Sequence, residues 1–127
     1  MFWEESEFPL TLAPDLLEQH FELLIDSPDL FCVVIEKENM VVGFLIGMIA
    51  RTAFSHDPIA TEMAWYVRPS ARGTREPIKL IKEYENWAER RGCKVVTMVD
   101  IHNLNDLGNL YTRLGYELTE KTYTKVL

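Results

Sequence analysis

The sequence predicts a mixed α+β fold in which a mostly antiparallel sheet contains one parallel pair of strands. Residues 31–36 and 40–53 are apolar and β-prone, and the short polar segment 37–39 joins them, which is typical of an antiparallel hairpin. Residues 62–68 and 94–100 also read as strands, and they flank an amphipathic helix at 77–91. Because two strands joined through one crossover helix lie parallel, these segments predict a βαβ unit.

Length and composition are typical of one compact domain spanning 1–127. The 127 residues are 47% hydrophobic and 26% charged, which is enough apolar material for a core. The net charge of −7 argues against a general nucleic-acid-binding protein, because phosphate backbones are bound by clustered Lys and Arg. The positive residues gather mainly between 68 and 94, which suits one small anion, and the acidic remainder favours a cationic or neutral acceptor.

Two cysteines and the longest apolar run bear on the cellular setting. Cys32 and Cys93 lie in apolar or strand-edge contexts without metal-binding or redox spacing, so we expect two buried, reduced thiols, no metal site and a cytoplasmic location. The run from Met40 to Ala50 is too short to span a bilayer, and the chain opens without a charged-then-apolar leader. Neither secretion nor membrane insertion is therefore expected.

The N-terminal sequence predicts a segment that packs against the domain, followed by a helix. Residues 1–9 contain several aromatic side chains, which favours packing against the domain. Pro14 suits the first turn of a helix that extends to about Ile25. An apolar stripe on this helix is expected to face the core, and its members are Leu16, Leu17, His20, Phe21 and Leu24. His20 is interpreted as a hydrogen-bonded core histidine rather than a catalyst, because no Ser or Cys lies near it in sequence.

The hairpin strands carry two further signals. The near-continuous apolarity of residues 31–36 predicts burial on both faces, and Gly43 and Gly47 in the next strand indicate a bulge or a close approach of backbone. The connection 51–58 contains an adjacent His56 and Asp57. This pair has the residue types of a catalytic relay, but exposed polar loop residues are more often simply solvated.

Residues 62–77 form the stretch that we expect to carry function. The β-prone residues up to Val67 end at Pro69, which cannot donate to a ladder, and Pro77 suits the first turn of the following helix. A loop between a strand and a helix N-terminus presents backbone N–H groups and a positive dipole end, which together favour an anion. Arg72, Arg75 and the permissive Gly73 strengthen this interpretation. The alternative is an ordinary strand-to-helix connection with solvent-facing arginines.

The C-terminal third predicts a short helix and closing strands. Gly92 ends the long helix, and Asn103, Asn105 and Asp106 offer N-caps for a short helix that reaches Leu114. Gly115 then stops this helix before final strand segments from Tyr116 to Leu127.

Two motifs resemble the GNAT family of N-acetyltransferases. The segment Val67-Arg68-Pro69-Ser70-Ala71-Arg72-Gly73 is similar to that family's acetyl-CoA signature, and Leu110-Tyr111-Thr112-Arg113-Leu114-Gly115-Tyr116 is similar to its Leu-Tyr-x-x-x-Gly-Phe/Tyr ending. The first motif also looks like that of short members carried by bacteriophages. The resemblance implies a GNAT-like fold with helices on both faces of the sheet, acetyl-CoA as cosubstrate, and transfer of an acetyl group to a small-molecule or protein amine.

The resemblance also implies roles for individual residues. Tyr111 matches the position where the family often places the acid for the departing thiolate, and an ordinary phenol, with a pKa of about 10, is protonated at neutral pH. Glu62 matches the part of the strand where the family often has a glutamate acting as base, directly or through water. The expected cofactor-binding residues are Trp65, Tyr66, Val67, Arg72, Gly73, Thr74, Arg75, Glu76 and Asn105. The alternative to these catalytic roles is that Tyr111 is a core tyrosine and Glu62 a surface glutamate.

The chain departs from the family pattern in two places. Arg75 and Pro77 stand where further glycines usually follow, and the opening strand and helix of the family are abbreviated before Leu12. These departures favour a second hypothesis, a non-catalytic binding or assembly protein with the same fold. An abbreviated N-terminus would also leave a sheet edge uncovered, which favours a homodimer.

Overall fold

The computed structural model describes residues 9–101 and 107–127. By their contacts these residues fall into two compact units, one formed by Met1–Pro14 with Met98–Leu127 and the other by Asp15–Thr97, and each unit is described by itself. The prediction of a single domain stays a prediction. The second unit contains the sheet.

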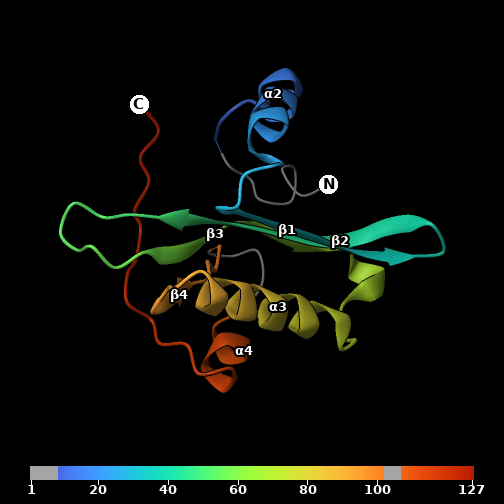
Figure 1. Ribbon diagram of the computed structural model, residues 1–127. Coiled ribbons are helices and arrows are strands. Elements are labelled where there is room, and N and C mark those ends of the chain that lie inside the picture. The colour runs from blue at the N-terminus through green and yellow to red at the C-terminus, as the bar shows by residue number, and fades with distance from the viewer. Residues whose placement is uncertain (1–8, 102–106) are drawn as a thin grey trace. The chain divides into compact units, whose positions relative to one another are not determined.

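The sheet has four strands in the order β1-β2-β3-β4 (Figure 1). Its members are β1 (Leu30–Lys37), β2 (Met40–Ala50), β3 (Ile59–Val67) and β4 (Val95–Thr97). The β1–β2 and β2–β3 pairs are antiparallel, and the β3–β4 pair is parallel. The predicted fold class is therefore confirmed, although β4 is far shorter than the expected strand 94–100.

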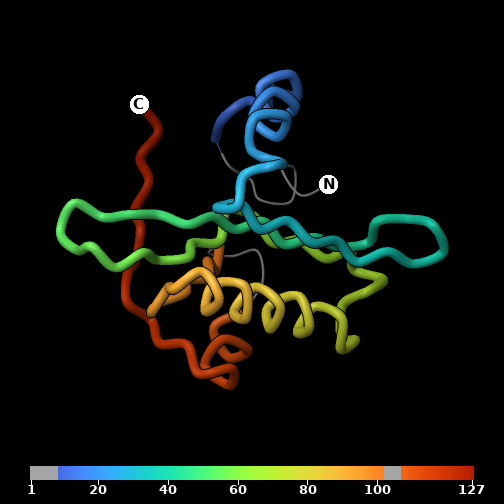
Figure 2. Tube along the Cα trace, in the orientation of Figure 1, coloured from blue at the N-terminus to red at the C-terminus, as the bar shows by residue number. Residues whose placement is uncertain are grey.

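The hairpin turn also follows the prediction. Glu38 and Asn39 both have positive φ values, of 51° and 61°, and lie between the paired residues Lys37 and Met40. Two consecutive residues of this conformation form the turn whose twist matches the twist of the strands. This turn and the 51–58 loop lie at opposite ends of the sheet (Figure 2).

Helix α3 (Glu76–Arg90) packs along one face of the sheet and forms the core with it (Figure 1). Its apolar stripe faces the strands as the periodicity predicts, except that Ile78 is 37% exposed. Tyr84 and Ile81 are fully buried, and Tyr84 and Trp87 both lie against the ring of Phe31. Gly92, with a φ of 81°, follows the end of the helix as expected.

Both strand glycines mark close approaches, as predicted. A Cβ on Gly47 would lie 2.5 Å from Cε2 of Tyr84, and a Cβ on Gly43 would lie 3.1 Å from the carbonyl oxygen of Tyr66. A bulge lies beside Gly47, because Ile46 pairs with Ala64 while Gly47 pairs with Glu62, so Met63 is the extra residue of β3. Helix α3 can therefore sit directly on β2 only because residue 47 has no side chain.

Four burial predictions are wrong: those for β1, for the thiol of Cys32, for the stripe of α2 and for His20. In β1, Phe31 and Ile35 are buried but Cys32 and Val34 are exposed, so this strand is covered on one face only. Helix α2 (Pro14–Leu24) lies on the opposite side of the sheet from α3 and has no buried residue (Figure 1). Its expected core stripe is open, with Leu16 62% exposed, and His20 is exposed rather than buried.

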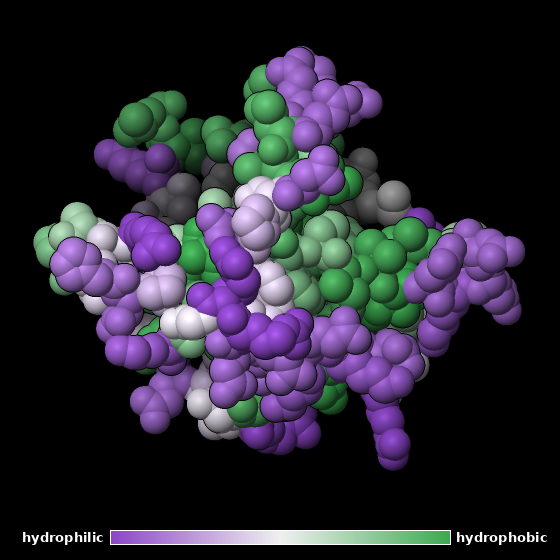
Figure 3. All heavy atoms as spheres, viewed as in Figure 1, coloured by the Kyte–Doolittle hydropathy of each residue, from purple (hydrophilic) through white to green (hydrophobic). Residues whose placement is uncertain are grey.

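The reason is the lack of a covering partner. Helix α2 makes no extensive contact with any other helix or strand among the described residues, so none of these elements covers its apolar stripe. Apolar side chains of α2 accordingly lie at the surface in the view of Figure 3. An amphipathic pattern shows which side of a helix is apolar, but only the neighbouring elements decide whether that side is buried.

The unit that contains the C-terminus has one helix among its described residues, α4 (Gly108–Arg113). Gly115, with a φ of 91°, ends it, and its N–H donates to the carbonyl of Thr112, as expected of a C-terminal glycine. The predicted caps Asn103, Asn105 and Asp106 lie outside the described residues. The N-cap residue of α4 is Leu107, which makes no side-chain capping bond.

The strand prediction for residues 116–127 is wrong, because this segment contains no strand. Its alternation of polar and apolar residues suits a strand, but a strand exists only where a neighbour completes the ladder. The described part of this unit holds no strand that could pair with it. Among the described residues, no helix is long and apolar enough to cross a membrane.

Candidate active site

The loop between β3 and α3 has the predicted strand, loop and helix order. β3 ends at Val67, and a 3₁₀ turn (η1, Pro69–Ala71) follows at once. The N–H of Arg68 donates to the carbonyl of Val42 over 2.8 Å, which ties the start of the loop to β2. Gly73 then takes a φ of 79°, a conformation that other residues rarely adopt, and the chain turns into α3. The loop therefore has a defined shape.

The turn into α3 presents unused backbone donors. Among the described residues, no group accepts a hydrogen bond from the N–H of Gly73, Thr74, Arg75, Glu76 or Ile78. The side chain of Thr74 is engaged, since its hydroxyl donates to the carbonyl of Ala71 over 2.9 Å. Pro77, the second residue of α3, has no N–H to contribute. N–H groups at the positive end of a helix suit an anion with several oxygen atoms.

The two arginines of the loop lie in different environments. The Nε of Arg72 donates to the carbonyl of Val67 over 2.7 Å, and its guanidinium lies 5.6 Å from the centre of the Tyr66 ring. Tyr66 pairs with Phe44 of β2, which is the neighbour of the core residue Leu45. Neighbouring side chains of a strand point to opposite faces, and Leu45 is on the α3 side. Tyr66 therefore lies on the face of the sheet opposite α3. Arg72 thus braces the strand end on that face.

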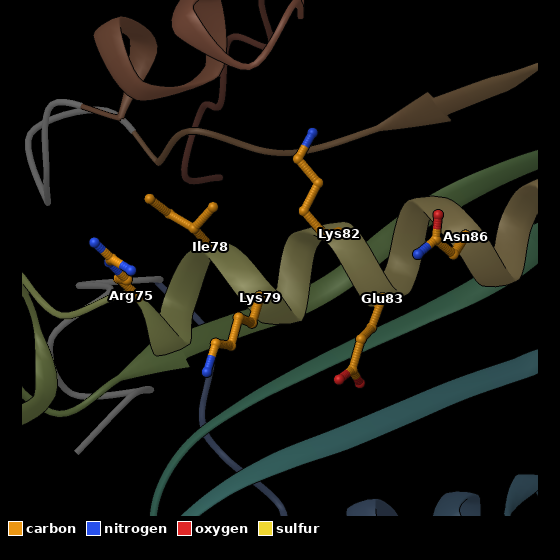
Figure 4. Close-up of a pocket in the computed structure, with 6 residues that line it drawn as sticks. All are labelled: Arg75, Ile78, Lys79, Lys82, Glu83 and Asn86. Carbon is orange, nitrogen blue, oxygen red and sulfur yellow. The ribbon is translucent and has the colours of Figure 1, made fainter.

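Arg75 instead stands at the start of α3, beside a shallow depression of about 360 Å³ on the outer side of the helix (Figure 4). The depression is lined by Arg75, Ile78, Lys79, Lys82, Glu83 and Asn86. The two lysines pair with carboxylates of the same helix, Lys79 with Glu76 at 3.1 Å and Lys82 with Glu85 at 3.3 Å. No carboxylate among the described residues pairs with Arg75, so its charge is available to a ligand of the loop.

The bulge at Met63 decides where Glu62 points. Without it, Glu62 would lie on the same face as Ala64 and Tyr66, because side chains alternate along a strand. With the bulge, Glu62 is the partner of Gly47, and Gly47 lies against Tyr84 of α3. Because paired residues lie on the same face of a sheet, Glu62 faces α3. The residue is half-buried. Trp65 and Val67, the partners of Leu45 and Gly43, lie on the same face, and Trp65 is half-buried.

Tyr111 is buried in the other unit and hydrogen-bonded there. Its hydroxyl donates to the carbonyl of Val99 over 2.8 Å, and its ring centre lies 5.8 Å from that of Tyr116. This geometry anchors α4 to the chain after β4. Tyr111 and Glu62 belong to different units, and Asn105 lies outside the described residues.

Other sequence candidates have ordinary surroundings. His56 is exposed, and Asp57 pairs with Lys94 at 3.0 Å, so the two do not form a relay with each other. Burial raises the pKa of the Cys93 thiol, and it raises that of Cys32 even though this residue is exposed as a whole. Thiols with raised pKa values are protonated at neutral pH and are weak nucleophiles. Within the described residues, no cluster of His, Cys, Asp and Glu could hold a metal ion.

Sequence reasoning missed a polar cluster at the end of β4. The hydroxyl of Tyr84 donates to the carbonyl of Thr97 over 3.2 Å, and the hydroxyl of Thr97 donates to that of Thr61 over 3.1 Å. Periodicity marks Tyr84 as a core residue of α3, but it gives no sign of which backbone group its hydroxyl meets. The register of β3 against β4 supplies that information.

Several known structures with a similar fold are described as acetyltransferases, and another is described as a transcriptional regulator. Glucosamine-6-phosphate N-acetyltransferase from Arabidopsis thaliana superposes with a TM-score of 0.78 at 15% identity, over 98% of this chain and 86% of that one. A putative acetyl transferase from Pyrococcus furiosus gives 0.74 at 22% identity, over 98% and 86%. At these identities the likeness shows the fold. No curated protein has a sequence that matches this one significantly.

A structure with a bound ligand is also similar. The aminoglycoside N-acetyltransferase AAC(6')-Iy, crystallised with CoA, superposes with a TM-score of 0.72 at 19% identity, over 90% of this chain and 87% of that one. The family model described as "Acetyltransferase (GNAT) family" matches residues 1–116, which includes the loop after β3, Glu62 and Tyr111. The chain belongs to the GNAT acetyltransferase family.

Proposed function

We propose that this protein binds acetyl-CoA at the loop before α3 and transfers the acetyl group to an amine. The observation that carries the proposal is the set of backbone N–H groups from Gly73 to Ile78 that have no acceptor among the described residues. They stand at the positive end of α3, and Gly73, with its φ of 79°, lets the loop turn them into one site. A pyrophosphate has the oxygen atoms and the charge that such a site fits.

The chemistry needs a base and an acid. Bound acetyl-CoA supplies the acetyl group as a thioester; the amine nitrogen forms the new C–N bond while the C–S bond breaks. Glu62, half-buried on the α3 side of β3, takes the proton that the amine loses, directly or through a water. Tyr111 gives its phenolic proton to the sulfur, for which its hydroxyl must turn away from the carbonyl of Val99.

A cationic amine is the acceptor class that the charge favours. The net charge of the chain is −7, which favours a cationic acceptor. The positive side chains Arg75, Lys79 and Lys82 near the loop suit one small anion. Similar folds belong to enzymes named for glucosamine-6-phosphate and for aminoglycosides, so amino sugars are the first acceptors to test. Polyamines and protein N-termini carry the same kind of amine and are the next acceptors to test.

The first test is binding. We expect CoA to release or absorb heat on titration and to raise the melting temperature, because a ligand of the native state stabilises it by mass action. Adenosine, which lacks the phosphates, is the matched control and should do neither at the same concentration. Absence of both effects with CoA would contradict the proposal.

The second test is turnover with a panel of amines. Product should be followed by mass, because this measurement detects the acetylated amine directly. Acetylation of a cationic amine by the parent chain, and none by Glu62→Gln, is the expected result. A parent chain that binds CoA tightly but acetylates no amine would favour the second hypothesis.

That second hypothesis is a binding or assembly protein that has the same fold and no catalytic activity. Arg75 and Pro77 favour it, because the family has glycines there and Pro77 removes one N–H from the first turn of α3. The two hypotheses share the fold and differ in whether the loop, Glu62 and Tyr111 carry out acetyl transfer. Binding and turnover together therefore separate them.

A further inference from the structure

Helix α2 exposes apolar side chains and carboxylates next to each other. Leu16 is 62%, Leu17 51% and Leu23 81% exposed, and Leu16 and Leu23 lie two turns apart on one side of the helix. Figure 3 shows apolar and polar side chains side by side on this part of the surface. An acidic stripe runs along the helix and the turn after it at helical spacing, and its exposed members are Asp15, Glu18, Glu22 and Asp26.

The charge of this surface is entirely negative. Residues 1–36 contain nine Asp and Glu residues and no Lys or Arg. Among the described residues of this segment, Asp29 pairs with Arg91 at 2.6 Å. No cation among the described residues pairs with the four carboxylates of the acidic stripe. The exposed leucines of α2 are therefore bordered by charges of one sign that are available to a partner.

This charge decides among the possible occupants of the surface. In a symmetric pair of copies joined through α2, the acidic stripes of the two helices would lie near each other, and like charges in an interface oppose association. A membrane surface with anionic headgroups repels the same stripe. A protein segment with Lys or Arg beside apolar side chains is instead attracted at long range, and it covers the leucines on contact.

We infer that α2 is a docking surface for a basic, amphipathic segment of another protein. The leucines supply the apolar centre of the contact, and the acidic stripe supplies a charged rim that steers the partner and selects it by sign. The helix lies on the side of the sheet opposite α3, whose first turn carries the N–H groups proposed to bind CoA (Figure 1). Docking on α2 therefore needs neither CoA nor turnover, and the inference does not rest on the proposed function.

The probe is a fluorescent synthetic helix of about four turns, built from leucine and lysine with the leucines on one side. A second peptide has glutamate in place of every lysine. A third keeps the composition of the first but scatters the leucines around the helix. We expect fluorescence anisotropy at low salt to show that the full-length chain binds the first peptide at least about tenfold more tightly than either of the others.

Substitutions locate the binding. Leu16→Gln and Leu23→Gln each remove one apolar contact and keep good helix propensity, so each should weaken binding of the first peptide about threefold to tenfold. Leu118→Gln is the matched control, because Leu118 is 79% exposed outside α2, and it should change nothing. Glu22→Gln should weaken binding about twofold to threefold at low salt and not at high salt, whereas the exposed Glu120→Gln should not.

Four outcomes would overturn the inference. Equal weakening by Leu16→Gln and Leu118→Gln would make the binding a general property of the surface, and tight binding of the glutamate peptide would remove the selection by charge. A parent chain that binds none of the peptides would show that α2 is not open to a partner. A fall in mass on light scattering caused by Leu23→Gln would make a second copy the occupant. Failure of CoA to bind would leave all these results unchanged.

Discussion

At the scale of single residues, the two arginines of the loop differ in what they contact. Arg72 is engaged with Val67 and Tyr66 on the face opposite α3, so its side chain shapes the strand end. Arg75 has no carboxylate partner among the described residues and stands at the start of α3. The two arginines of this motif therefore have different surroundings, and the prediction that both bind the cofactor stays a prediction.

Arg75→Ala should weaken CoA binding about fivefold at low salt. The guanidinium is exposed, so its bond to a phosphate is screened and is worth about 1 kcal/mol rather than the larger value of a buried pair. The affinity of the parent should also fall more steeply with salt than that of the variant. Calorimetric titration at two salt concentrations measures both effects. Arg90→Ala, at the opposite end of the same helix, is the control, and equal affinities of Arg75→Ala and the parent would refute the assignment.

Tyr111→Phe should lower turnover while CoA affinity stays within about twofold of the parent. The change removes the proposed acid and leaves the carbonyl of Val99 without this donor, so we also expect a loss of about 1 kcal/mol in the free energy of unfolding. Tyr123→Phe is the control, because Tyr123 is 90% exposed. Urea unfolding, titration and product mass separate the three quantities. Parallel losses of turnover and CoA affinity would mark Tyr111 as structural.

Among the elements, the contact between β2 and α3 positions the rest of the site. Tyr84 of α3 lies on Gly47, Gly47 pairs with Glu62, and the bulge at Met63 turns Glu62 towards the helix. The same helix begins at the loop and carries the unused N–H groups at its first turn. One packing contact thus fixes both the orientation of the proposed base and the start of the proposed phosphate site.

Gly47→Ala should lower the free energy of unfolding by about 2–3 kcal/mol. The new Cβ would lie 2.5 Å from Cε2 of Tyr84, so the helix or the strand must shift, which is the cost of overpacking a core. Gly92→Ala is the control, since nothing lies within 4 Å of its Cβ position and only its φ of 81° is strained. Urea unfolding of both variants makes the comparison. A smaller loss for Gly47→Ala than for Gly92→Ala would show that the contact is loose.

At the scale of the whole molecule, the sheet-containing unit exposes apolar surface at its end strand. β1 is the end strand of the described sheet, and Val34 on its outer face is 50% exposed. Edge strands of this kind tend to pair with other chains unless charge or cover prevents it.

We expect the protein to form a dimer through the edge of β1. Light scattering should give twice the mass of the chain at micromolar concentration, and Val34→Lys should return the mass to that of one chain, because a lysine at an edge opposes pairing. Val126→Lys, a matched change at a position 71% exposed outside the sheet, should leave the dimer intact. A parent chain of single mass at all concentrations would contradict this expectation.

The sequence by itself determined the features that depend on neighbours along the chain. The hairpin turn at Glu38 and Asn39, the loop with Gly73, the helix behind Pro77 and the parallel βαβ order all follow from local conformational preference and short connections. These observations, with the two family motifs, were enough to predict the fold and the place of the candidate site.

Only the tertiary structure decided the features that depend on partners far apart in the chain. Whether Glu62 faces α3 depends on one extra residue in β3, and whether Cys32, His20 and the α2 stripe are buried depends on which element covers them. The bond from Tyr84 to Thr97 requires the register of β3 against β4. Residues 116–127 have the alternating pattern of a strand, but they form no strand, because none of the described strands pairs with them. Burial and pairing are properties of two surfaces together, and a sequence pattern specifies only one of them.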